Sequence, residues 1–420
     1  MATKQQDPYL AFRFPEFRYF MAASFLFTVA LLVQEVIIGY EMYKITGDPL
    51  AIGLLGLAQA APFIGLVLVG GHFADLLSKK KMLTLSLSGI ICCSLALFVA
   101  AKEMGDGNHS TELQLIIYGV VFLIGTFYAF FSPTAQALRA FLIPRHAYEN
   151  AATWSSAAWQ TGTIVGPGIS GFIYAWVGFA NTILVVTGLL GIVLLLLQFI
   201  GDRKIASSTA GGVFTKIKEG IRFVWQTKML LYSISLDLFS VLFGGVVAIL
   251  PVFAEDILKV GPQGLGILRA APAVGAVLVL LLMSRLSVLG SAWKTLLLNV
   301  AGFGVATLVF ALSKNFWLSV TALFFTGAFD SVSVVIRQTI LQILVPDEMR
   351  GRVSSVNGVF VSASNELGAF ESGLAASLIG AVPSVVAGGV VTLGVVGWVW
   401  WKSKGLMGVD LREGEVKGNG

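Results

Sequence analysis

Long apolar runs constrain this chain more than any other feature of its sequence. The runs Phe20–Ile38, Leu113–Phe131 and Val382–Trp401 each have about the ~20 residues that a helix needs to cross the hydrocarbon core of a bilayer. Hydrophobic residues make up 56% of the chain and charged residues only 12%, against roughly 25% charged residues in an average soluble domain. Because a soluble core could not bury so much apolar surface, the sequence predicts an all-α membrane protein.

Twelve such segments are predicted, and they fall into two sets of six. The first set covers residues 18–45, 50–73, 82–101, 113–138, 151–175 and 177–200, and the second covers 229–257, 263–286, 292–312, 315–342, 353–379 and 381–402. The expected domains are an amino-terminal six-helix bundle at 1–200, a cytoplasmic linker with an amphipathic surface helix at 201–228, a carboxy-terminal six-helix bundle at 229–402 and a cytoplasmic tail at 403–420.

The distribution of basic residues predicts the orientation of these spans, because cytoplasmic loops carry the excess of Lys and Arg. With the amino terminus inside, nearly all basic residues fall on the cytoplasmic side, and only Lys44, Lys102, Lys259 and Lys314 fall outside. Gaining or losing one helix would destroy this asymmetry. The net charge of +5 therefore reflects membrane orientation and not nucleic-acid binding, and both termini are expected in the cytoplasm.

The two halves share sequence as well as helix number. Gly56–Gly65 in the second span aligns with Gly266–Gly275 in the eighth, and the glycines, alanines and proline coincide. A second alignment matches Gly125, Phe127, Gln136, Pro144, Gly166 and Gly171 with Gly327, Phe329, Gln338, Pro346, Gly368 and Gly373. Such a repeat predicts two six-helix bundles related by pseudo-twofold symmetry, one of which rocks against the other around a site at mid-membrane depth.

The loop after the second span combines glycine, one carboxylate and a basic cluster, in Gly71, Asp75, Lys79 and Lys80. The glycines let helices approach closely, and the charges lie where they can latch neighbouring helix ends. This pattern resembles the signature between helices two and three of the major facilitator superfamily, a family of secondary transporters. The usual arginine and glycine are replaced here by Leu76 and Ser78.

The resemblance implies a gating role for this loop. Asp75 is expected to face the cytoplasmic start of helix eleven near Val353 and to pair with Arg139 at the end of helix four. Together these residues, with Gly71, Lys79 and Lys80, would close the cytoplasmic side in the outward-facing state. The alternative is a solvated loop that obeys only the positive-inside rule.

The fifth span carries small residues four apart together with a proline, in Gly162, Gly166, Pro167 and Gly171. Such a stretch permits tight helix packing and a bend. It is similar to the antiporter motif of the same superfamily, with Ser170 where glycine is usual, and the similarity favours export over uptake. Nearly the whole chain resembles the drug and siderophore exporter branch, which includes enterobactin and macrolide exporters.

Ionisable residues inside the predicted spans are the sharpest clues to mechanism. Each costs about 2.5–3.5 kcal/mol at a helix centre, so such residues ordinarily face a cavity or a partner. Glu35, Asp330 and Glu366 lie near the midplane and are the expected proton-coupling residues, with Glu35 or Asp330 carrying the proton. Low polarity disfavours the charged form of a carboxylate, which lets it bind and release protons as access alternates. Permanently paired structural charges are the alternative.

A substrate cavity is expected to be lined by polar and aromatic residues of the same spans. These residues are Gln34, Tyr128, Trp159, Arg337 and Asn365. Asp330 and Arg337 are two helical turns apart, about 10.5 Å along the axis, so they are expected to share a face without touching. Asp237, Arg269 and Glu371 lie at other depths and receive no role.

These observations predict a proton-coupled secondary transporter that exports a small organic molecule of the drug or siderophore class by alternating access. A flippase for lysophospholipid or another lipid and a proton-coupled uptake symporter use the same fold and stay open. A membrane-embedded metal enzyme is not expected, because no His-Glu-x-x-His pair occurs and the three histidines are scattered over loops.

The expected partners are a small-molecule substrate and the lipid bilayer, with no nucleic acid. The protein is expected to act as a monomer in the plasma membrane, the inner membrane of a bacterium. No cofactor or metal is expected, and the proton gradient is the predicted driving force.

Overall fold

The structure, a computed structural model, describes residues 7–76, 78–104, 110–139, 141–202, 213–283 and 292–406. The described residues form helices, and no strand occurs among them. Ten described segments are long and apolar enough to cross a membrane. One of these, Arg145–Gln198, contains two predicted spans. The predicted span 353–379 lies in the 33-residue helix Asp347–Ile379, of which only the shorter stretch Leu367–Ile379 is strongly apolar. The all-α fold is confirmed, and the predicted number of spans is roughly consistent with it.

Two compact units divide the chain. The first comprises Met1–Gly47 and Leu57–Ser208, and the second comprises Asp48–Gly56 and Thr209–Gly420. The first turns of one helix, residues 48–56, therefore cluster with the second unit. The domain boundaries expected at residues 200 and 228 stay a prediction.

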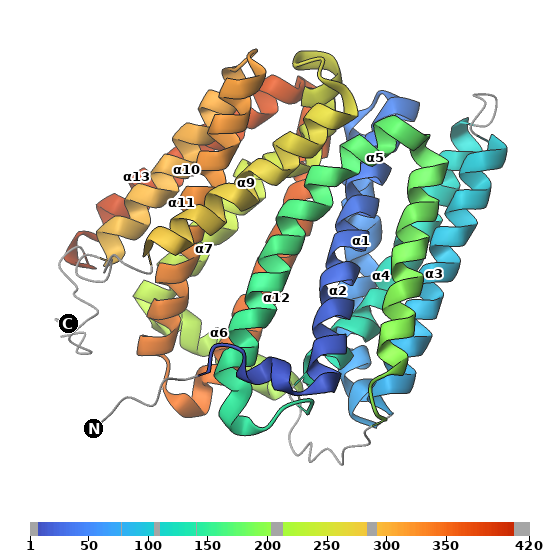
Figure 1. Cartoon of the computed structure of the whole chain (residues 1–420). Coiled ribbons are helices and arrows are strands. Elements are labelled where there is room, and N and C mark those ends of the chain that lie inside the picture. Colours follow the sequence, from blue (N-terminus) through green and yellow to red (C-terminus); the bar gives the residue numbers. More distant parts are fainter. Residues whose placement is uncertain are drawn as a thin grey trace. The chain divides into compact units, whose positions relative to one another are not determined.

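The helices of the first unit are α1 (Pro15–Thr46), α2 (Pro49–Leu76, beyond its first turns), α3 (Lys79–Met104), α4 (Ser110–Arg139) and α5 (Tyr148–Gln198). Helix α1 lies along α5, while α3 contacts both α4 and α5 (Figure 1). Helix α5 joins the two spans predicted at 151–175 and 177–200, and Gly178, with φ 77°, interrupts its helical geometry. A positive φ is accessible to glycine at little cost because glycine has no Cβ.

The helices of the second unit are α6 (Val213–Gln226), α7 (Lys228–Gly244), α8 (Leu250–Val252), α9 (Gly261–Met283), α10 (Ala292–Leu312), α11 (Phe316–Leu344), α12 (Asp347–Ile379) and α13 (Ala381–Lys402). The amphipathic helix expected within residues 201–228 is α6. The span predicted at 229–257 is not one regular helix. After α7 the chain forms a 3-10 turn (Val246–Ile249), the short α8 and a π-helical turn (Phe253–Ile257).

Three consecutive residues, Gly47, Asp48 and Pro49, explain where α1 ends and α2 begins. Gly47 caps α1 with φ 62°, and its N–H donates to the Tyr43 carbonyl at 2.7 Å. The Asp48 carboxylate then accepts from the Leu50 N–H at 2.9 Å, and Pro49 is the first residue of α2. A left-handed glycine after one helix and an acidic residue followed by proline before the next are common helix end signals.

The duplicated glycines of the sequence form equivalent helix crossings in the two units. In the first unit, Gly125 of α4 lies directly against the backbone of Gln59 in α2. In the second unit, Gly327 of α11 lies directly against the backbone of Pro272 in α9. A Cβ atom at either glycine would collide with a carbonyl group, so both positions require glycine for close helix approach.

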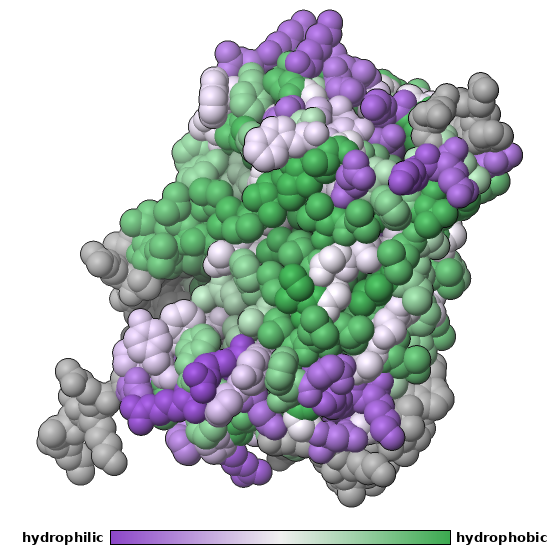
Figure 2. Space-filling view, turned by 45° about the vertical axis from the view of Figure 1, so that its right-hand side comes forward, coloured by the Kyte–Doolittle hydropathy of each residue, from purple (hydrophilic) through white to green (hydrophobic). Residues whose placement is uncertain are grey.

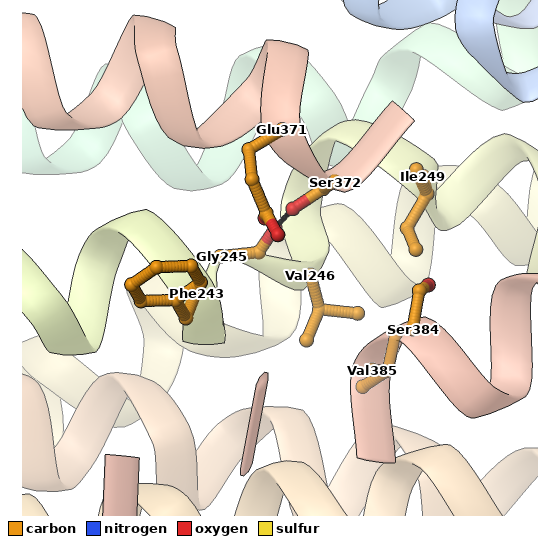
Figure 3. A pocket seen from close by; sticks show the side chains of 8 residues that line it. All are labelled: Phe243, Gly245, Val246, Ile249, Glu371, Ser372, Ser384 and Val385. Atoms are coloured by element: carbon orange, nitrogen blue, oxygen red, sulfur yellow. Dashed lines mark hydrogen bonds between the residues drawn. The ribbon is translucent and has the colours of Figure 1, made fainter. Parts of the chain in front are cut away.

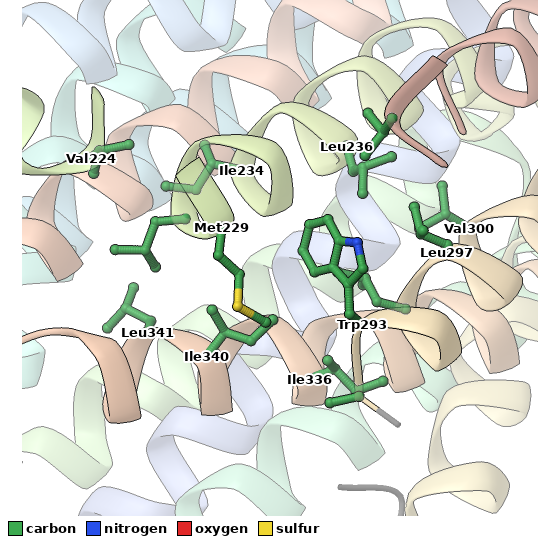
Figure 4. Close-up of a cluster of buried hydrophobic side chains, with 14 of the residues drawn as sticks. Val224, Met229, Ile234, Leu236, Trp293, Leu297, Val300, Ile336, Ile340 and Leu341 are labelled. Atoms are coloured by element: carbon green, nitrogen blue, oxygen red, sulfur yellow. The ribbon is translucent and has the colours of Figure 1, made fainter. Parts of the chain in front are cut away.

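A buried cluster around Trp293 anchors the second unit (Figure 4). Trp293 of α10 is fully buried, and its indole N–H donates to the Ser403 hydroxyl at 2.8 Å. Leu236, Leu297 and Ile336 belong to the same cluster, so α7, α10 and α11 share one core. In Figure 2, hydrophobic side chains gather across the middle of the visible face, with hydrophilic ones toward its ends, as expected for a surface that contacts lipid.

The amino-terminal segment Asp7–Arg13 folds onto the start of α5. The Asn150 side chain donates to the Pro8 carbonyl at 2.8 Å and accepts from the Ala11 N–H at 3.0 Å. The Trp154 indole N–H donates to the same Pro8 carbonyl at 2.9 Å. The Tyr9 ring stacks on Trp154 at 5.6 Å between centroids. These contacts hold the segment beside the first turns of α1 and α5.

Candidate functional site

A cavity of about 180 Å³ lies within the first unit, between α1, α4 and α5. For scale, an engineered cavity of roughly 150 Å³ binds benzene, so this space suits about one aromatic ring. Its lining comprises six aromatic side chains, several hydroxyl groups, one amide and one guanidinium. They are Phe20, Phe25, Phe27, Tyr128, Phe131 and Trp159, with Met21, Ser24, Thr28, Ser132, Ala135, Gln136, Arg139, Ser155 and Ala158.

Helical spacing brings these side chains to one place. The lining residues of α4 fall at positions 128, 131, 132, 135, 136 and 139, an i, i+3, i+4, i+7 pattern that belongs to a single helix face. The aromatic rings also contact one another. Tyr128 stacks on Phe27 at 6.3 Å and on Phe63 of α2 at 5.5 Å between centroids, and Phe27 stacks on Phe131 at 4.2 Å. These contacts fix the aromatic wall before any ligand binds.

Two predicted substrate-binding residues, Tyr128 and Trp159, line this cavity. Trp159 is 58% exposed and therefore presents most of its ring to the open space. Arg139, which was expected to act in the gate, also belongs to the lining. Among the described residues that line the cavity, Arg139 alone carries a charge.

Gln34 does not line the cavity, contrary to expectation. It is 3% exposed, and its side-chain amide exchanges hydrogen bonds with the Ser94 hydroxyl of α3 at 3.2 and 3.3 Å. Neighbouring residues of a helix point about 100° apart, so the next residue, Glu35, faces elsewhere and is exposed. Glu35 lies within electrostatic range of the Tyr128 side chain on α4.

The small residues of the fifth span set the distance between α1 and α5. A Cβ atom added at Gly162 would lie 2.8 Å from Thr28, and one at Gly166 would lie 2.9 Å from Leu32. The two helices therefore touch at these glycines, as the motif predicts. Pro167 lies inside α5, and its carbonyl accepts a hydrogen bond from Ser170 at 2.7 Å.

The loop between α2 and α3 is only partly described. Gly71 and Asp75 belong to the end of α2. The Asp75 side chain lies outside the described residues, so the expected pairing of Asp75 with Arg139 stays a prediction. Lys79 is buried, and the Lys80 ammonium donates to the Gln198 carbonyl at 2.7 Å. Ser78, which replaces the usual glycine, donates to the carboxylate of Asp202. The loop is thereby tied to the end of α5.

The second unit contains a cluster of three charged residues on α7 and α11. Arg337 of α11 forms an ion pair with Asp237 of α7, and its side chain also lies 3.7 Å from the Asp330 carboxylate. The side chains of Arg337 and Asp237 are 13% and 8% exposed, whereas that of Asp330 is 48% exposed. The buried pair is thus joined by a carboxylate that remains accessible.

Asp330 and Arg337 share a face of α11, as expected, but the expectation that they do not touch was wrong. Side chains on a helix lean toward its amino terminus, and the Arg337 Nε donates to the Ser333 carbonyl one turn earlier at 3.3 Å. The long guanidinium group therefore reaches back to Asp330. Sequence reasoning gave Asp237 no role, although a lone carboxylate in one span and a lone arginine in another suggest a pair.

The remaining predicted residues lie on α12. Asn365 is exposed, and Glu366 belongs to the helix, but its side chain lies outside the described residues. No three His, Cys, Asp or Glu side chains gather into a metal site within the described ranges. Two features of the described residues thus bear on the predicted site, the aromatic cavity in the first unit and the acidic cluster around one arginine in the second.

Comparison with known proteins relates this arrangement to transporters. The sequence profile of the Major Facilitator Superfamily matches residues 19–369. The multidrug efflux pump Tap of Mycolicibacterium fortuitum is 27% identical over 80% of this chain and 82% of its own length. The enterobactin exporter EntS of Shigella flexneri is 27% identical over 89% of this chain and 86% of its own length.

Solved structures show the same fold at low sequence identity. A bacterial homologue of the human lysosomal transporter Spinster has a TM-score of 0.71 at 15% identity, covering 96% of this chain and 99% of its own. The nucleoside transporter NupG has a TM-score of 0.65 at 15% identity, covering 93% of this chain and 98% of its own. The chain therefore belongs to the major facilitator superfamily and is a multi-pass membrane transporter, not an enzyme.

Proposed function

We propose that this transporter exports a small organic molecule with an aromatic ring, and that protons moving inward drive the export. The observation that carries the proposal is the aromatic cavity of the first unit, with Tyr128 and Trp159 in its wall. The relatives named as a multidrug efflux pump and an enterobactin exporter support export rather than uptake.

The cavity also favours a charge class for the substrate. Planar ligands stack on aromatic rings, and organic cations are usually held by aromatic faces together with carboxylates. Here the described lining offers a guanidinium, Arg139, and no carboxylate. We therefore expect a neutral or anionic aromatic molecule to bind better than a cationic one of the same size.

The acidic cluster of the second unit supports proton coupling. Asp237 and Arg337 neutralise each other, which leaves Asp330 as a carboxylate in excess of the positive charge. Its side chain is half exposed, so a proton can reach it. One proton that moves inward with the membrane potential supplies about 2.3 kcal/mol per 100 mV. Glu35, exposed on α1 and near Tyr128, is the second candidate.

Everted membrane vesicles would test the proposal, with a fluorescent aromatic acid as the transported probe. An imposed pH gradient should drive its accumulation in vesicles that contain the parent protein. Asp330→Asn or Glu35→Gln should abolish this accumulation, while exchange of labelled for unlabelled probe without a gradient should persist. Glu103→Gln, an exposed carboxylate at the end of α3, is the matched control and should transport normally.

Two results would contradict the proposal. If both single variants keep full gradient-driven accumulation, neither carboxylate carries the coupling proton. If the parent accumulates the probe in right-side-out vesicles instead, the protein works as an uptake symporter.

The proposed orientation is tested separately with a tag at either end of the chain. A protease added at the cytoplasmic face should cleave both tags, and a protease added at the other face should cleave neither.

A further inference from the structure

The second unit contains a small cavity at the point where α7 is interrupted (Figure 3). Helix α7 ends at Gly244, and Gly245, with φ −73° and ψ 81°, leads into the 3-10 turn. The cavity has a volume of about 10 Å³, which is the space of about one water-sized particle. Glu371 and Ser372 of α12 and Ser384 of α13 line it together with apolar side chains.

The polar side chains of this cavity can act toward its interior only as hydrogen-bond acceptors. The Ser372 hydroxyl donates its hydrogen to the Gly245 carbonyl at 3.1 Å, and the Ser384 hydroxyl donates to the Ala381 carbonyl at 2.8 Å. A hydroxyl group has one hydrogen, so both oxygens present only lone pairs to the cavity. An ionised Glu371 likewise offers acceptors alone. Such a set of oxygens is complementary to a positive charge.

The interrupted helix adds negative potential at the same place. The last carbonyl groups of a helix lack partners within it and carry the negative end of its dipole. Helix α7 ends at the rim of the cavity, where Phe243 and Gly245 belong to the lining. Carbonyl groups at such breaks coordinate small cations in other membrane transporters.

Glu371 gives the site its charge. Its carboxylate forms no hydrogen bond or ion pair with any other described residue, although it lies in the apolar stretch Leu367–Ile379 of α12. An uncompensated carboxylate in an apolar segment of a membrane protein is unfavourable. One carboxylate is neutralised by one monovalent cation, whereas a divalent ion would leave a net positive charge.

We propose that this cavity binds a monovalent alkali-metal cation, with Glu371 as the charged ligand and the hydroxyl oxygens of Ser372 and Ser384 beside it. The volume admits Na⁺ or K⁺ and excludes organic cations. The ion ties α12 and α13 to the end of α7. It also lies next to Gly373 of α12, which packs against Gly53 in the first turns of α2.

Thermal unfolding of the purified full-length protein in detergent tests this site without any transport assay. NaCl and KCl are titrated separately, with choline chloride added to hold the ionic strength constant. We expect a saturable rise in Tm with at least one of the two salts. Glu371→Gln should abolish the rise, and Ser384→Ala should weaken the apparent affinity about tenfold.

Ser331→Ala is the matched control, because the Ser331 hydroxyl also donates to a carbonyl three residues earlier but lies outside the cavity. This variant should show the same rise in Tm with salt as the parent protein. The proposal is overturned if neither salt raises Tm above choline chloride, or if Glu371→Gln and Ser384→Ala respond like the parent. A Glu371→Gln protein that fails to fold leaves Ser384→Ala to decide.

Discussion

The two units share a helix crossing but differ in their polar residues. Gly125 of α4 contacts the backbone of α2 at Gln59, and its repeat Gly327 of α11 contacts the backbone of α9 at Pro272, about one turn beyond the residue that aligns with Gln59. The first unit places aromatic rings and one half-buried guanidinium around a cavity, whereas the second holds a largely buried guanidinium between two carboxylates. Duplication thus preserved a close crossing at a glycine while the polar positions of the two units diverged.

The largest effect is expected from Arg337→Met in the second unit. Removing the guanidinium leaves Asp237 buried without its partner, which costs about 3–5 kcal/mol of folding free energy. Thermal unfolding in detergent would measure the loss. The double variant Arg337→Met/Asp237→Leu should recover most of it, because no buried charge remains.

Lys294→Met serves as the control for that loss, since Lys294 is exposed on α10 and such changes usually stay within about 0.5 kcal/mol. If Arg337→Met is as stable as the parent, the charge cluster is not a structural element of the second unit. The contrast between an aromatic cavity in the first unit and a charge cluster in the second would then no longer hold.

The next largest effect is expected at the duplicated crossings. Gly125→Ala and Gly327→Ala each place a methyl group against a backbone carbonyl, and overpacking of this kind costs about 1–3 kcal/mol. Gly119→Ala in α4 is the control, because nothing lies within 4 Å of its Cβ position. Equal losses of folding free energy in Gly125→Ala and Gly327→Ala would show that the two units share the same close helix crossing. A loss of stability in only one of the two variants would contradict a shared crossing.

A smaller effect, on transport alone, is expected in the aromatic cavity. Trp159→Ala removes a stacking surface worth about 0.5–1.5 kcal/mol, so KM for an aromatic probe should rise roughly two- to tenfold. Protein stability should not change, because the side chain is largely exposed. Trp176→Ala on the same helix, 91% exposed and outside the cavity, should leave KM unaltered, and an equal rise there would argue against the cavity.

The smallest effect is expected from Ser78→Gly, which restores the glycine usual in the superfamily. The change removes the hydrogen bond to Asp202, a contact whose net contribution is about 0.5–1.5 kcal/mol at most. Transport should persist. A loss of transport without a loss of stability would show that the serine has acquired a functional role in this chain.

Much of the fold could be predicted because spanning helices are recognisable in a sequence by their length and apolar composition. Helix α10 has the predicted bounds, and α1 extends beyond its prediction by only a few residues. The interruption after Gly244 could not be read from hydropathy, because residues on both sides are equally apolar. The Gly244-Gly245 pair was the available signal, since adjacent glycines mark breaks in a helix.

The site was harder to predict than the fold. Tyr128 and Trp159 line the cavity, but Gln34 turns toward Ser94 instead. Helix α1 is apolar on every side, so its sequence pattern does not distinguish the face that lines a cavity from the face that packs. The pairing of Asp237 with Arg337 joins two helices far apart in the sequence, and no local pattern reports such a contact.

The amino-terminal segment has a practical consequence for experiments on this protein. Its carbonyl at Pro8 is held by Asn150 and Trp154, and the rings of Tyr9 and Trp154 are stacked. A fluorophore attached near residue 7 would thus travel with the beginning of α5, whose glycines touch α1, and would not sample solvent as a loose label does. Quenching by Trp154 would make that label a direct gauge of how this helix moves during a transport cycle.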